Sequence, residues 1–68
     1  MTSLDKMNAL IGKAYIQVSE GEHLNAFDTL DLARTQAKLH GNGQISDKHE
    51  IILTAVKNAA FESIEYHS

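Results

Sequence analysis

The side chains in this sequence that could do chemistry are histidines and carboxylates, and they are scattered along the chain. The histidines are His23, His40, His49 and His67. They occur singly, without HxxxH or HExxH spacing, and there is no cysteine, whereas a zinc site needs three or four convergent ligands. We interpret Asp28 and Asp31, one helical turn apart, as a solvated face rather than a catalytic pair. Since nucleophile motifs and glycine-rich phosphate loops are also missing, the sequence predicts no enzyme, no cofactor and no metal site.

The segment GNGQIS, at positions 41–46, resembles the middle of an EF-hand calcium loop. Gly43 stands at the sharp turn of such a loop and Ile45 at its apolar position. Counting outward places Lys38 and His40 where that family has acidic ligands. Because the negative charge that binds Ca²⁺ is missing, we interpret this segment as a flexible turn between two helices.

Composition limits the classes of partner. The chain has 68 residues, which is one domain, and a net charge of −3 from nine acidic and six basic residues. No block of lysine and arginine occurs, which disfavours non-specific binding to nucleic acid or to an anionic membrane. No apolar run approaches the roughly 20 residues needed to span a bilayer, and no signal peptide is evident. We therefore expect a cytoplasmic protein, and the lack of cysteine fits a reducing compartment.

Apolar side chains repeat at intervals of three and four residues in three segments, at about 4–18, 20–40 and 47–66. Such spacing places them on one face of a helix. The face of the first segment consists of Leu4, Met7, Ile11, Ala14 and Val18, and that of the second consists of Ala26, Leu30, Ala33 and Ala37. The face of the third consists of Ile52, Val56, Ala59, Ala60 and the small residue Ser63, with Leu53 and Ile64 beside them. A short connection makes the first two segments antiparallel neighbours. The sequence predicts an all-α domain of three helices with an N-terminal antiparallel hairpin, which dimerises.

Local residues suggest where the helices end. Ser19 and Glu22 fit a capping box at the start of the second helix, although Gly21 could instead end the first. Gly41 is expected to supply the left-handed stop of the second helix. Gly12 lies inside the first helix, where it either lets a neighbouring helix approach closely or is a tolerated imperfection.

The second and third predicted helices carry apolar side chains outside their core stripes. Leu32 and Leu39 are seven residues apart and point roughly opposite the alanine stripe. They are either partly exposed or touched by the third helix, or they contact another subunit or a different partner protein. The third helix is apolar over more of its circumference than a surface helix requires. The candidate interface residues are Leu32, Leu39, Ile51, Ala55, Phe61 and Tyr66.

Glycine, aromatic, alanine and large apolar residues recur at set spacings through the first two predicted helices. They are Gly12, Tyr15, Gly21, Ala26, Leu30 and Ala33. Over residues of about 9–37 this pattern resembles a single tetratricopeptide-repeat-like hairpin, with His23 where the family has an aromatic residue and with two extra residues between the two parts. The resemblance implies a helical surface that binds a peptide or a protein.

These features predict a small non-catalytic protein that binds another protein through apolar helix faces, as a regulator, inhibitor or adaptor, and that forms a homodimer. One alternative is a small DNA-binding transcriptional regulator, but the third helix opens with SDKHE, which is neutral to acidic where a recognition helix needs basic and amide groups. A second alternative is a degenerate metal- or ligand-binding helical module. The sequence does not name the partner.

Overall fold

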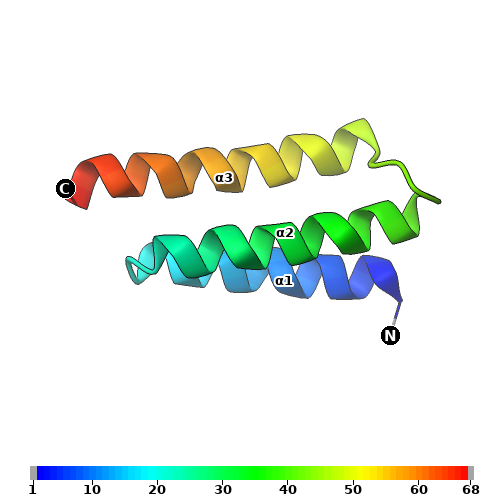
Figure 1. Cartoon of the computed structure of the whole chain (residues 1–68), viewed down its shortest axis with the longest axis horizontal. Coiled ribbons are helices and arrows are strands. Elements are labelled where there is room, and N and C mark those ends of the chain that lie inside the picture. Colours follow the sequence, from blue (N-terminus) through cyan, green and yellow to red (C-terminus); the bar gives the residue numbers. More distant parts are fainter. Residues whose placement is uncertain (1, 68) are drawn as a thin grey trace.

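The computed structural model describes residues 2–67, and the side chains of residues 2–65. It consists of three α-helices: α1 (Ser3–Ser19), α2 (His23–His40) and α3 (Asp47–His67). Figure 1 shows that α1 and α3 run in the same direction and that α2 runs opposite to both. α1 packs closely against α2, and α3 lies along this pair more loosely. The prediction of a three-helix all-α fold with an N-terminal antiparallel hairpin is confirmed.

The contact between α1 and α2 is built on small side chains. Ala14 of α1 and Ala26, Ala33 and Ala37 of α2 are all buried. Alanine has no side chain beyond Cβ, so the two helix backbones approach each other closely along this line. The predicted stripes of these two helices therefore face each other.

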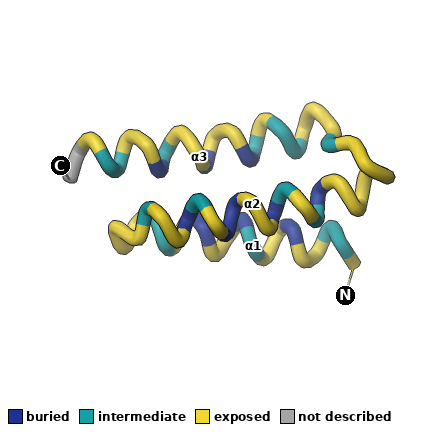
Figure 2. Tube along the Cα trace, in the orientation of Figure 1, coloured by how far each residue is buried: buried dark blue, intermediate teal, exposed yellow. Residues whose placement is uncertain are grey.

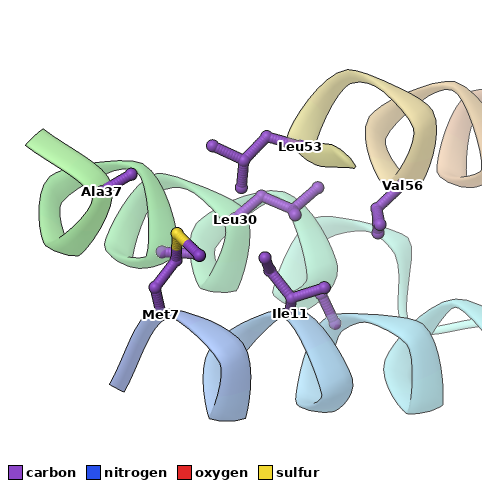
Figure 3. Packing of buried hydrophobic residues seen from close by; sticks show 8 residues of the cluster. Met7, Ile11, Leu30, Ala37, Leu53 and Val56 are labelled. Carbon is purple, nitrogen blue, oxygen red and sulfur yellow. The ribbon is translucent and has the colours of Figure 1, made fainter. Parts of the chain in front are cut away.

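α3 completes the core with a few larger side chains. Leu53 and Val56 are buried, and Figure 3 shows them pointing toward Leu30 of α2 and toward Met7 and Ile11 of α1. Figure 2 shows that the buried residues of α3 lie along the side that faces the hairpin, while its opposite side is exposed. The third helix thus contributes one face to the core, but this face is centred closer to Leu53 than the predicted stripe is, since Ile52, Ala59 and Ser63 are only partly buried.

The turn between α1 and α2 terminates α1 and does not cap α2. Gly21 has a φ of +79°, its N–H donates to the carbonyl of Val18 at 3.1 Å, and the N–H of Glu22 donates to the carbonyl of Gln17 at 2.8 Å. This is the Schellman arrangement that glycine favours after a helix. Ser19 is the last residue of α1, and Glu22 makes no side-chain capping hydrogen bond. The predicted capping box is therefore wrong, and α2 begins three residues later than predicted.

The loop between α2 and α3 also differs from the prediction. Gly41 has a φ of −95°, and the left-handed residue is Asn42, with a φ of +56°. The N–H of Gly43 then donates to the carbonyl of Lys38 at 2.7 Å, which closes the last turn of α2. The left-handed stop was thus assigned to the wrong residue. Glycine is still required at position 41, because a Cβ there would collide with the carbonyl oxygen of Gln44.

Hydroxyl side chains cap the other two helix starts. Thr2 and Asp5 form a reciprocal capping box at α1, in which the N–H of Asp5 donates to Thr2 Oγ1 at 3.1 Å. At α3, the N–H of His49 donates to Ser46 Oγ at 3.3 Å. These bonds satisfy amide groups that have no partner within the helix.

Gly12 and Gly41 provide a matched pair for testing the backbone. Gly12 is exposed, and a Cβ there would meet nothing within 4 Å, so this glycine is a tolerated imperfection. Gly12→Ala is expected to raise the free energy of unfolding by about 1 kcal/mol through helix propensity. Gly41→Ala is expected to lower it by about 1–3 kcal/mol through steric overlap. Urea unfolding measures both changes, and the same sign for the two variants would contradict this description of the loop.

Candidate protein-binding surface

A groove runs between α2 and α3 on one side of the molecule. It contains a half-open pocket of about 250 Å³. The residues that line it are Phe27, Leu30, Asp31 and Arg34 from α2 and Leu53, Lys57 and Phe61 from α3. This set is called the α2–α3 groove below. It exists because α3 packs less closely than α1 does, so side chains of α2 that face α3 are only partly covered.

Two aromatic rings form one end of the α2–α3 groove. The ring centroids of Phe27 and Phe61 are 5.0 Å apart, and the ring planes are inclined by 47°. This is a favourable arrangement for two aromatic side chains. The buried side chains of Leu30 and Leu53 also line the groove. The groove therefore has an apolar floor with aromatic carbon exposed at its edge.

An ion pair links the two helices at the other end of the groove. Arg34 donates two hydrogen bonds to the Glu50 carboxylate, at 2.9 Å and 3.1 Å. The hydrogen bonding between these two side chains lowers the pKa of Glu50 and raises the pKa of Arg34. Both side chains remain partly exposed. Asp31, on the same helix, also raises the pKa of Arg34, but its effect is smaller than that of Glu50.

The two long edges of the groove differ in charge, because the α2 edge carries Asp31 next to Arg34 and the α3 edge carries Lys57. Asp31 stands on the α2 side and Lys57 on the α3 side, and both are exposed. Within the described part of the chain, the side chain of Lys57 makes no hydrogen bond or ion pair. A ligand that lies in the groove therefore meets a carboxylate along one edge and an ammonium group along the other.

The predicted interface residues are exposed wherever their side chains are described. The exposed fractions are 58% for Leu32, 61% for Leu39, 69% for Ile51 and 51% for Phe61. Ala55 is exposed as well, and the side chain of Tyr66 lies outside the described residues. These values agree with the interpretation that Leu32 and Leu39 are partly exposed, and the contact with another subunit or partner stays a prediction.

The same residues do not form a single patch. Phe61 lies in the α2–α3 groove, where it meets Phe27. Ile51 and Ala55 are one turn apart on the side of α3 away from the core, and Leu32 and Leu39 lie on exposed parts of α2. The structure therefore divides the predicted surface into a groove and two outer helix faces.

The sequence interpretation missed Phe27 and Lys57 as groove residues. Phe27 was recognisable as a flank of the core stripe of the second helix, but its pairing with Phe61 depends on how α3 is rotated about its own axis. Helical spacing within either segment carries no information on that rotation. Nothing in the sequence marked Lys57 as a groove residue, since an exposed lysine on a helix is ordinary.

Two histidines approach each other beside the loop between α2 and α3. The ring centroids of His40 and His49 are 5.8 Å apart. Among the described residues, no group of three or more histidine, aspartate or glutamate side chains is placed to hold a metal ion. This pair therefore falls short of the ligand number that a protein zinc site uses.

Comparison of the chain with protein-family models, with curated proteins and with solved structures finds no match. The resemblance to a tetratricopeptide-repeat hairpin therefore stays a prediction. In the described part of the chain, none of the helices combines the length and the apolar character that crossing a membrane requires.

The Arg34–Glu50 pair predicts a specific pH dependence of stability. Because the pKa of Glu50 is lower in the folded chain than in the unfolded chain, its contribution is present above the unfolded pKa and is lost as the pH falls through the folded pKa. Glu50→Gln is expected to lower the urea midpoint at pH 7 and to change it less near about pH 3. Asp28→Asn, an exposed carboxylate on α2, serves as the control. Equal losses for Glu50→Gln at both pH values would contradict the ion pair.

Proposed function

We propose that this chain is a small non-catalytic protein-binding domain of the regulator, inhibitor or adaptor type. The observation that supports this most directly is the α2–α3 groove, with its apolar floor and its half-exposed aromatic pair. Grooves between helices are a recurrent docking site for amphipathic helices, which insert large apolar side chains at helical spacing. Phe27 and Phe61 offer aromatic surface of the kind that is enriched at protein interfaces.

The size of the groove favours a protein partner over a small molecule. Sites for small molecules commonly enclose about 300–1,000 Å³ and bury most of the ligand, whereas this pocket measures about 250 Å³ and is open on one side. One or two large apolar side chains of a partner fill such a space, and the rest of the partner lies over the opening. The charged edges also help to orient the partner. Acidic side chains of the partner are attracted to Lys57, and its basic side chains are attracted to Asp31.

The proposal includes a homodimer. A domain of 68 residues buries only about 60% of the surface of its unfolded chain, and small domains often gain stability by association. Large apolar side chains outside the groove, among them Leu39 and Ile51, are more than half exposed. A second copy of the chain is a partner that covers such side chains on both molecules at once.

Partner binding through the groove is tested with two matched alanine variants. Phe61→Ala removes an aromatic ring from the groove, and Ile16→Ala removes a comparably exposed side chain from α1. In affinity capture from the native host, the Phe61 variant is expected to lose proteins that the parent chain and the Ile16 variant retain. Circular dichroism checks that both variants fold. Retention of the same proteins by all three chains would contradict binding at the groove.

Dimer formation is tested by sedimentation equilibrium across micromolar concentrations. The apparent mass is expected to rise with concentration toward twice the chain mass of 7.5 kDa, because the monomer and the dimer exchange by mass action. A mass that stays at 7.5 kDa over the whole range would reject the homodimer.

A further inference from the structure

The side of α3 that faces away from the core carries a regular pattern of its own. Lys48, Ile51, Ala55, Asn58 and Glu62 follow one another at intervals of three, four, three and four residues, and all of them are exposed. This spacing places them in one line along the helix. Figure 2 shows that this side of α3 is exposed along its length. The five residues are called the outer stripe below.

The charges of the outer stripe are arranged symmetrically about its centre. Lys48 lies seven residues before Ala55 and Glu62 lies seven residues after it. If two copies of α3 lie antiparallel with Ala55 opposite Ala55, Lys48 of each copy stands opposite Glu62 of the other. A twofold axis produces this contact twice. A parallel arrangement would set lysine against lysine and glutamate against glutamate, so the charges select the antiparallel one.

The uncharged residues of the stripe suit the same register. Ala55 lies at the centre, where a small side chain lets two helices approach closely. Ile51, which is 69% exposed, then lies opposite the turn of the second copy that contains Asn58 and Ala59. The large apolar side chain is thereby covered, and the polar ends of the stripe remain at the rim of the contact.

We propose that this chain forms its dimer through the outer stripe, as an antiparallel pair of α3 helices centred on Ala55. The proposal rests on the homodimer of the proposed function and supplies its interface and register. The contact is closed, because a twofold axis uses the same surface on both copies. Lys57 and Phe61 are not part of the stripe, so the α2–α3 groove of each copy stays accessible to another protein.

Site-directed crosslinking tests the register directly, because the chain has no cysteine of its own. Ala55→Cys places two thiols next to the twofold axis. Treatment with a short bismaleimide is expected to convert most of this variant to a covalent dimer. Ile16→Cys, on the exposed side of α1, and Leu32→Cys, on α2, are expected to crosslink at least fivefold less at the same protein concentration.

Charge reversal tests the pairing of Lys48 with Glu62. Lys48→Glu and Glu62→Lys each create two like-charge contacts per dimer, so each is expected to raise the dimer dissociation constant at least threefold. The double variant restores opposite charges and is expected to return within twofold of the parent value. Lys13→Glu, on α1, controls for the change in net charge. Sedimentation at low salt measures the parent chain and the four variants.

The outcomes separate this inference from the proposed function. Preferential crosslinking at position 55 together with rescue by the double charge reversal supports the antiparallel α3 contact. A dimer that crosslinks through position 32 instead, or one that the charge reversals leave unchanged, overturns this contact and leaves the homodimer standing. A chain that stays monomeric overturns both the contact and the homodimer, while the capture experiment on Phe61 still decides partner binding.

Discussion

The close packing of α1 against α2 through alanine side chains is the constraint on which the rest of the structure depends. Small side chains bring the two backbones together, but they bury little apolar area for each residue. The larger buried side chains of the hairpin, Met7, Ile11 and Leu30, pack together with Leu53 and Val56 of α3. Leu32 and Leu39 lie on another face of α2, which neither α1 nor α3 covers.

α3 contributes residues both to the core and to the two surfaces through which we propose that the protein makes contacts. Leu53 and Val56 attach it to the hairpin, and the Arg34–Glu50 pair fixes its position along α2. These attachments use one part of its circumference. The side toward α2 contributes Lys57 and Phe61 to the groove, and the side away from the core carries the outer stripe. One helix can therefore serve two different contacts without conflict, because helical periodicity keeps them on separate faces.

Residue spacing predicted the three helices and their core faces, because the side chains that a helix buries recur every three to four residues along its sequence. It misplaced the start of α2, where Gly21 serves the end of α1 and Ser19 belongs to that helix. Two overlapping end signals within four residues compete for the same backbone amides, and the local sequence does not rank them. The candidate site was predicted in part: Phe61 was selected, but its partner Phe27 was not, since that pair depends on the mutual rotation of two helices.

The uneven packing of the three helices also sets an order in which the molecule opens. Backbone amides exchange with solvent through local unfolding, and segments with few packing contacts open at the lowest free energy. The hairpin is built from two segments that are adjacent in the sequence, and α1 and α2 pack more closely with each other than with α3. A loop that contains Gly41 and Gly43 joins α3 to the hairpin. We therefore expect deuterium to enter α3 before it enters the middle of α1 and α2. Such partial opening would expose Leu53 and Val56 to water, together with the side chains of Met7, Ile11 and Leu30 in the same core cluster.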